Sequence, residues 1–218
     1  MMHKKMKLTI NADELREWEV CSTGLGHFVA VHGENTVSLE KALESNSVKE
    51  FIYVFFRNKN HFSDAQVKDI KLLICNFAEH VLAFFEEKYP EDKRPRKAIE
   101  TARKYICGGA SANDVVVAAD AATVAAHSVA VHSLGAAFYI VATVDIADVV
   151  TIDDACAAHS VVSAADIYAY AAGGKEEHKW QRQKLIELIE KWKIESDNYE
   201  RDKNYKKLID IFIFEQNL

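Results

Sequence analysis

The sequence predicts an all-α fold, either a multi-helix bundle or a helical-hairpin array, with an Ala-rich buried centre. Only 2 prolines and 8 glycines occur among 218 residues, so the chain contains few residues that break helices. Helix-start patterns recur along the chain, and apolar residues repeat at helical spacing after them. Hydrophobic residues make up 49% of the chain, enough for a sizeable core at this length. We therefore expect a single helical domain over residues 1–218, divided by composition into segments 1–104, 105–174 and 175–218.

Residues 1–104 are expected to form amphipathic helices. Asn11 is followed three residues later by Glu14, a spacing at which each side chain satisfies a backbone N–H group at a helix start. Ser63 and Gln66 repeat this spacing, and each start precedes stretches with one apolar face. These stretches are LREWEVCSTGLGHF, VKEFIYVFF and VKDIKLLICNFAEHVLAFFEEKY.

Residues 105–174 differ sharply from the rest of the chain. They contain no Lys, Arg or Glu, and their only acids are seven aspartates, so we expect them to form the buried centre. Mostly apolar or small residues step by alternating four and three from Ala118 to Ile146, which describes one continuous helical seam. The other faces are nearly as apolar, and such a helix is expected to be buried on all sides. Gly135 within this stretch predicts the close approach of another helix backbone.

The central segment also carries signals for helix ends. Two pairs with the helix-start spacing are Ser111 with Asp114 and Thr151 with Asp154. Helix stops are expected at the glycine pairs Gly108–Gly109 and Gly173–Gly174, because glycine readily adopts positive φ. We therefore expect several helices between residues 105 and 174.

Residues 121–144 are uncharged and long enough to span a membrane. They include two histidines, and Asp145 and Asp148 follow directly, which makes insertion into lipid unfavourable. We therefore expect a buried helix in a protein that does not bind a membrane.

Residues 175–218 are heavily charged again, with one apolar stripe at helical spacing. The stripe consists of Trp180, Leu185, Leu188, Ile189 and Trp192. The end of the segment, YKKLIDIFIFEQNL, fits either a short strand or a docking helix.

The overall charge, the start of the chain and the cysteines limit the partners and the compartment that we expect for the protein. A formal net charge of −6 argues against a nucleic-acid partner, because binding to phosphates requires a basic surface. The start, MMHKKMKLTINADELREW, has basic residues without a following apolar run, unlike a signal peptide. The four cysteines are scattered without a C-x-x-C motif, which favours neither a zinc site nor a disulfide framework. We therefore expect a cytoplasmic protein in which each cysteine is a small buried hydrophobe.

No catalytic motif is recognisable, and no E-x-x-H pair is available for a di-iron site. Asp120 and His127 share a helix face, but two turns separate them by roughly 10 Å. His159 and Asp166 repeat this spacing. We therefore predict no catalytic residue, no metal site and no cofactor, and we assign the polar residues of the central segment to structural or partner contacts. These residues are Asp120, His127, His132, Asp145, Asp148, His159 and Asp166.

Arg94 and Arg96 flank Pro95, which fits the first turn of a helix. The N-terminal end of a helix is unfavourable for cations, because the helix macrodipole is positive there. We therefore expect both arginines to contact acidic or carbonyl groups, with Asp92 and Glu100 as candidates.

Two runs resemble a known family. DKRPRKAIETARK at residues 92–104 and VHSLGAAFYIVATV at residues 131–144 resemble bacterial immunity proteins of polymorphic toxin systems, the group numbered five. LREWEVCSTGLGHF and EEHKWQRQKLIELI are similar to the flanking parts of that family, so the likeness covers residues 12–190. The chain departs from the family in lacking basic residues between Tyr105 and Gly174, with Thr143 where a lysine is expected.

The resemblance implies a cytoplasmic protein that binds a cognate toxin and neutralises it by occlusion, without catalysis. It does not identify the residues that touch the toxin or the oligomeric state. Two alternatives remain open. One is a helical enzyme or metal-binding protein that uses the Asp/His group, and the other is a helical ligand-binding or scaffold protein.

Overall fold

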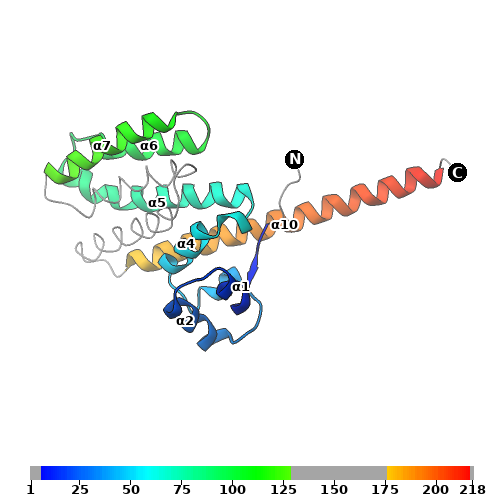
Figure 1. Cartoon of the computed structure of the whole chain (residues 1–218). Coiled ribbons are helices and arrows are strands. Elements are labelled where there is room, and N and C mark those ends of the chain that lie inside the picture. The colour runs from blue at the N-terminus through cyan, green and yellow to red at the C-terminus, as the bar shows by residue number, and fades with distance from the viewer. Residues whose placement is uncertain (1–5, 129–175, 217–218) are drawn as a thin grey trace.

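The computed structural model describes residues 6–128 and 176–216 and confirms the all-α class. Helices account for most of this part of the chain, and a single pair of two-residue strands accompanies them (Figure 1). In order, the elements are β1 (Thr9–Ile10), α1 (Ala12–Glu17), α2 (Ser22–His32), β2 (Val37–Ser38), α3 (Leu39–Ala42), α4 (Val48–Arg57), a 3-10 turn (Lys59–His61), α5 (Asp64–Lys88), α6 (Arg94–Ile106), α7 (Ala112–Ser128) and α10 (Glu176–Gln216).

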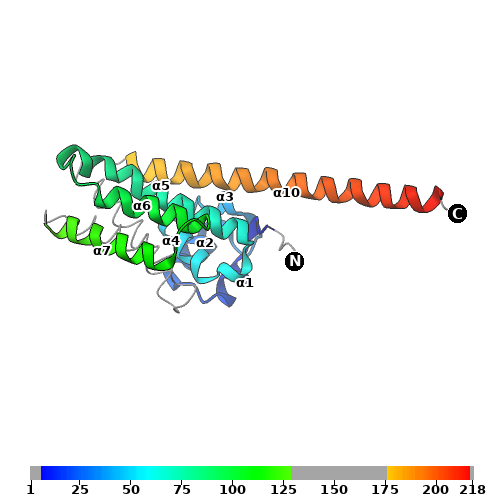
Figure 2. The same ribbon diagram turned by 90° about the horizontal axis from the view of Figure 1, so that it is seen from above.

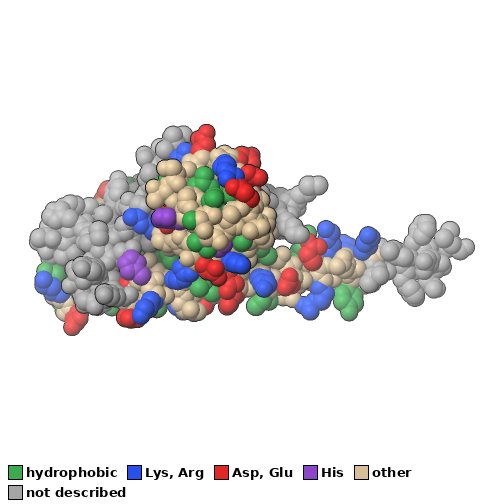
Figure 3. Space-filling view, turned by 90° about the horizontal axis from the view of Figure 1, so that it is seen from below, with side chains coloured by type: hydrophobic (Ala, Val, Ile, Leu, Met, Phe, Trp, Pro, Cys, Tyr) green, Lys and Arg blue, Asp and Glu red, His purple; other side chains and the backbone are tan. Residues whose placement is uncertain are grey.

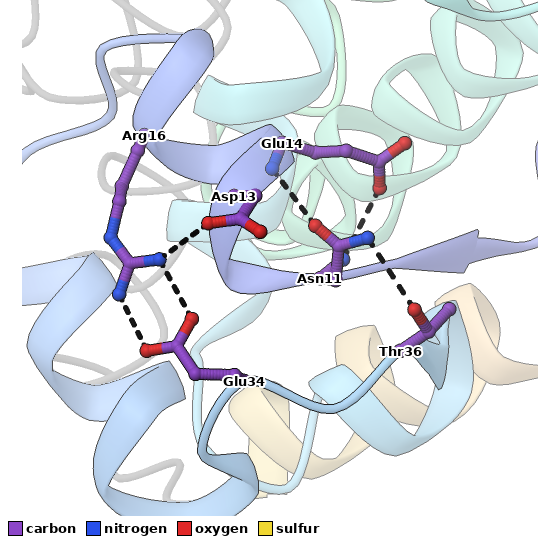
Figure 4. Close-up of polar contacts among 6 residues, drawn as sticks. All are labelled: Asn11, Asp13, Glu14, Arg16, Glu34 and Thr36. Carbon is purple, nitrogen blue, oxygen red and sulfur yellow. Dashed lines mark hydrogen bonds and ion pairs between the residues drawn. The ribbon is translucent and has the colours of Figure 1, made fainter.

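The predicted helix starts are present wherever the structure describes them. At α1, the Glu14 backbone N–H donates to Asn11 Oδ1 at 2.9 Å, and the Asn11 N–H donates to Glu14 Oε2 at 3.2 Å (Figure 4). Reciprocal bonds of the same kind begin α5 at Ser63 with Gln66 and α7 at Ser111 with Asp114. These caps satisfy backbone donors that have no partner inside the helix.

Two features of the N-terminal part were not predicted. The stretch 15–28 is broken at Glu19, whose φ of 50° ends α1 and lets α2 start in a new direction. Strands β1 and β2 pair antiparallel, with Thr9 opposite Ser38 and Ile10 opposite Val37. The sequence carries no strand pattern there because two residues are too few to show an alternation.

Ion pairs connect α1 to the turn that follows α2. The Arg16 guanidinium donates to both carboxylate oxygens of Glu34, at 2.6 and 2.7 Å, and to Asp13 at 2.8 Å (Figure 4). The hydrogen bonds from Arg16 hold the pKa of Glu34 below its ordinary value. This paired geometry fixes the relative orientation of the two short helices.

Helices α5, α6 and α7 lie side by side (Figures 1 and 2). Helix α6 ends where the glycine pair predicted, and Gly108 adopts a φ of 79°. The Gly109 N–H then donates to the carbonyl of Lys104 at 2.7 Å, which closes the last turn. The chain thereby reverses into α7.

The expectation that the central helix is buried on all sides is wrong for the part that is described. Ala118 and Ala122 of the predicted seam are buried, together with Val115. Val117 and Val124, on other faces of α7, are each 60% exposed. An all-apolar pattern predicts full burial only if neighbours cover every face, and among the described elements α6 packs most extensively against α7. Gly135, the Thr151 start and the second glycine pair lie outside the described residues.

The charged C-terminal segment forms one helix, α10, of 41 residues. The strand alternative for its end is wrong, since the helix continues to Gln216. The predicted stripe faces the core, where Leu185, Ile189 and Trp192 are fully or almost fully buried. Beyond the body of the protein α10 continues as a single projecting rod (Figure 2).

Two cysteines correct the expectation that every thiol is buried. Cys75 is buried in α5, whereas Cys21 and Cys107 are exposed at helix ends. Cys21 precedes α2, and its sulfur accepts from the Gly24 N–H at 3.4 Å. A helix end leaves backbone groups that a polar or sulfur atom can satisfy at the surface, so an apolar neighbourhood in sequence does not ensure burial. Cys156 lies outside the described residues.

Within residues 6–128 and 176–216, we find no helix that combines the length and the apolar character needed to cross a membrane.

Candidate functional site

A surface groove of about 650 Å³ runs between α5 and the first half of α10. Its apolar part comes from Leu72, Leu73, Trp180 and Leu188. Charged and polar side chains surround that strip, namely Asp69, Asn76, Glu79, His80, Lys184, Glu187 and Lys191. An apolar strip inside a polar rim is the typical composition of a protein interaction site.

One end of the groove is built around Trp180. Its ring stacks on the imidazole of His80, with 3.8 Å between the ring centroids and 9° between the planes. Phe77, one turn before His80 on α5, meets the same indole edge-on at 5.8 Å. Trp180 is half-buried, so it presents part of its surface to the groove while two rings hold it in place.

His80 is itself fixed by a buried carboxylate. Its Nδ1 lies 2.6 Å from Glu177 Oε2, and Gln181 Nε2 donates to Glu177 Oε1 at 2.9 Å. Glu177 is only 4% exposed, so both of its oxygens are satisfied inside the protein. The carboxylate also lies in the first turn of α10, where the helix dipole favours an anion. Glu177 therefore positions His80, and through it Trp180.

The other end of the groove is anchored by Asp69. This carboxylate accepts from Lys191 Nζ at 2.9 Å and from the indole N–H of Trp192 at 2.8 Å. The hydrogen bond from Asp69 raises the pKa of Lys191 above its ordinary value. A single aspartate on α5 thus binds two consecutive residues of α10 and fixes the register between the helices.

An arginine network on α5 and α6 extends the polar rim. Arg96 pairs with Glu86 through both carboxylate oxygens, with Nε to Oε1 at 2.6 Å, and its Nη1 lies 3.4 Å from Glu79. Arg103 donates to Glu79 at 2.6 Å and to Asn76 at 2.7 Å. The hydrogen bonds from Arg96 hold the pKa of Glu86 below its ordinary value. Because Glu79 and Asn76 also line the groove, this network stiffens its edge.

The two arginines that the sequence singled out have separate surroundings. Arg94 forms a two-pronged contact with Asp92, at 2.6 and 2.9 Å, which also lowers the pKa of that carboxyl group. Arg96 instead reaches back to α5, and Glu100 acts on it only through longer-range attraction. Neither arginine lines the groove.

The other predicted polar residues do not build a common site in the described structure. Asp120 is exposed on α7, and His127 lies at the end of the same helix. His132, Asp145, Asp148, His159 and Asp166 lie outside the described residues. Among the residues that are described, no three His, Cys, Asp or Glu side chains gather in a way that would hold a metal ion.

Sequence reasoning identified only part of the groove. Trp180 and Leu188 were in the predicted stripe, but the α5 residues His80, Glu79 and Asp69 were not distinguished from a solvated helix face. One signal was available in the sequence, because Trp180 precedes Leu185 by five residues rather than three or four and therefore lies toward the edge of the stripe. Large aromatic residues at the edge of a buried stripe often contact a partner.

Comparison with known proteins places the groove inside a family segment. The family model described as Imm-5 like putative immunity protein matches residues 60–188, more than half of the chain. This range contains every residue that lines the groove except Lys191. No curated protein and no solved structure matches the chain. The resemblance seen at residues 92–104 and 131–144 is thus confirmed, and the chain belongs to the Imm-5 like family.

Proposed function

We propose that this protein acts in the cytoplasm as a non-catalytic immunity protein, which binds a cognate toxin domain and occludes its working surface. The groove between α5 and α10 is the proposed contact site. The observation that carries this proposal is that the family segment forms nearly the whole groove. At one end of the groove, Trp180 is held in place by two neighbouring rings. Tryptophan is among the residues that most often dominate the energy of an interface.

The rigidity of the groove supports this role. Trp180 is clamped between Phe77 and His80, and His80 is held by buried Glu177. A side chain that is already ordered loses little conformational entropy when a partner binds it. Occlusion requires only such a preformed surface, and no reacting group has to be placed.

The charges around the groove indicate what kind of partner surface fits. The rim carries the acids Asp69, Glu79 and Glu187 as well as Lys184 and Lys191, and the whole chain has a formal net charge of −6. Lysine neighbours partly neutralise the acids, so the rim offers paired charges of both signs. The excess of acid over the whole molecule favours the approach of a basic toxin domain, mainly through the rate of association.

The proposal can be tested by cloning the open reading frames next to this gene, one of which we expect to encode the cognate toxin domain. Co-expression should restore growth of cells that make the toxin, and calorimetry should give the dissociation constant. Trp180→Ala should raise Kd by about 30-fold or more, as expected for an aromatic residue that dominates the energy of an interface. Tyr199→Ala is the matched control, since Tyr199 is an exposed aromatic residue of α10 that does not line the groove.

A second variant separates binding from folding. Lys184→Glu changes a rim charge without removing core packing. The added acid should not slow association with a basic toxin domain, whereas loss of the Lys184–Glu187 pair should weaken docking at the groove and speed dissociation. Circular dichroism should show both variants folded. If the toxin binds Trp180→Ala and Lys184→Glu as tightly as the wild type, the groove is not its contact site.

A further inference from the structure

A second cavity lies in the N-terminal part of the chain, almost wholly outside the family segment 60–188. It has a volume of about 360 Å³ and is enclosed by residues from β1 to α4 together with Phe62. Its floor is apolar and buried, with Phe28, Leu39, Phe55 and Phe62 each almost fully shielded from solvent. The rings of Phe55 and Phe62 are only 4.2 Å apart, so the floor is largely aromatic.

The mouth of this cavity is polar. It is lined by Cys21, Gly24, Asn46 and Glu50, of which Cys21 is exposed and Asn46 and Glu50 are partly exposed. Asn46 Nδ2 donates to the Gly24 carbonyl at 3.0 Å, which ties α2 to the turn before α4. A Cβ on Gly24 would lie 3.3 Å from Cys21 Sγ and 3.7 Å from Glu50 Oε1. Glycine therefore keeps the mouth open where three polar side chains converge.

The two oxygens of Glu50 have different surroundings. Oε2 caps α4, accepting from the Ser47 N–H at 2.8 Å and from the Ser47 hydroxyl at 2.9 Å. Oε1 is turned toward the mouth, where His27 Nδ1 approaches to 3.6 Å, beyond hydrogen-bond distance. A carboxylate that is held by one oxygen and presents the other is well placed to accept a hydrogen bond from a bound cation.

The volume of the cavity, its apolar floor and its polar mouth together indicate which class of ligand would fit. Protein interiors are close-packed, and cavities of this volume with apolar walls and a few polar groups are typical of sites for small molecules. We propose that the cavity binds a small amphipathic amine, with its apolar body on the phenylalanine floor and its ammonium group on Glu50 Oε1. A fatty acid of the same length is disfavoured, because its carboxylate would face that of Glu50.

The proposal can be tested on the full-length protein with defined probes. N-phenyl-1-naphthylamine, whose fluorescence rises in apolar surroundings, should bind saturably with one site per chain. n-Octylamine should displace it at a concentration about tenfold lower than n-octanoate, because only the amine can pair with Glu50. The absence of saturable binding, or equal displacement by both competitors, overturns the proposal without any variant.

Two variants locate the site. Val54→Phe, which adds a ring at a residue lining the cavity, should abolish probe binding, whereas Val31→Phe on the exposed face of α2 should leave it unchanged. Glu50→Gln can still cap α4, since glutamine also serves in a capping box, and it should bind the dye but lose the preference for amine over carboxylate. Probe binding that survives Val54→Phe, or an amine preference that survives Glu50→Gln, places the ligand elsewhere and contradicts the proposal.

Discussion

The two halves of α10 differ in what keeps them helical. Up to Trp192 the helix packs against α4 and α5, and its apolar stripe is buried. Beyond it, Ile194, Tyr199 and Tyr205 are 62%, 51% and 64% exposed. The rod also carries charged side chains of both signs (Figure 3). One continuous helix therefore joins a segment stabilised by tertiary burial to a segment that has solvent on most sides.

The comparison shows how a helix can extend beyond its core. Starting a helix is unfavourable, whereas adding a residue to an existing one is nearly neutral for good helix formers. The packed half supplies the start, and the projecting half is rich in Glu, Lys and Arg, which favour the helix. Lys191 and Glu195, which lie 3.7 Å apart, form an ion pair at four-residue spacing where the two halves meet.

The largest contrast is expected from removing one aromatic side chain in each half. Trp192 is fully buried, and its ring lies stacked with that of Phe55 at 6.3 Å between the centroids. Trp192→Ala should therefore lower the free energy of unfolding by roughly 3–5 kcal/mol. Tyr199→Ala should change it by less than about 0.5 kcal/mol, because its ring is mostly in solvent. Urea unfolding followed by circular dichroism measures both, and similar losses would show that the projecting half is also packed.

A smaller effect is expected at the contact that fixes the register of the packed half. Asp69→Asn keeps the shape of the side chain but removes the charge that accepts from Lys191 and from the Trp192 indole. The expected loss is about 1–3 kcal/mol, as for a shielded hydrogen bond to a charged group. Glu195→Gln, which removes the more exposed partner of Lys191, is the control and should cost under about 0.5 kcal/mol. Equal effects on the melting temperature would rule out a special role for Asp69.

The same contact predicts a dependence on alkaline pH. Asp69 raises the pKa of Lys191 in the folded protein, so the stabilisation is complete below the ordinary lysine pKa of 10.5 and is lost as pH rises through the raised value. The wild type should therefore lose stability above about pH 10.5 by more than Lys191→Met does. Melting curves between pH 9 and pH 12 test this, and parallel curves for the two proteins would argue against the coupling.

The smallest effect is local and concerns the projecting half alone. Lys203→Gly should weaken the helix there by about 1 kcal/mol relative to Lys203→Ala, because Gly is the poorer helix former. Since Lys203 and its described neighbours up to Lys207 are exposed, the main melting transition should stay in place while nearby backbone amides exchange faster with solvent. Hydrogen exchange measured by mass spectrometry detects the change, and a shift of the whole transition would mean that the rod is part of the cooperative core.

The helical framework follows from signals that span only a few residues. The starts at Asn11, Ser63 and Ser111 and the stop at Gly108 depend on hydrogen bonds or backbone angles within one turn, so they are readable in sequence. The stripe that ends at Trp192 is equally local, since it requires only the helical period. The runs that resemble the Imm-5 like family were readable for a different reason, as patterns of residues in a fixed order.

Which residues are exposed, and where the groove and the cavity lie, depends instead on how the helices pack against one another. Nothing near Val117 in sequence distinguishes it from buried Val115, and the difference in exposure arises from which face of α7 packs against the protein. The groove exists because Asp69 sets the register of α10 on α5, and the N-terminal cavity exists because residues from β1 to α4 close around it. Caps and periods act over one or two turns and were determined by the sequence itself. Burial, register and cavities arise from contacts between residues as much as 123 positions apart, so only the tertiary structure decided them.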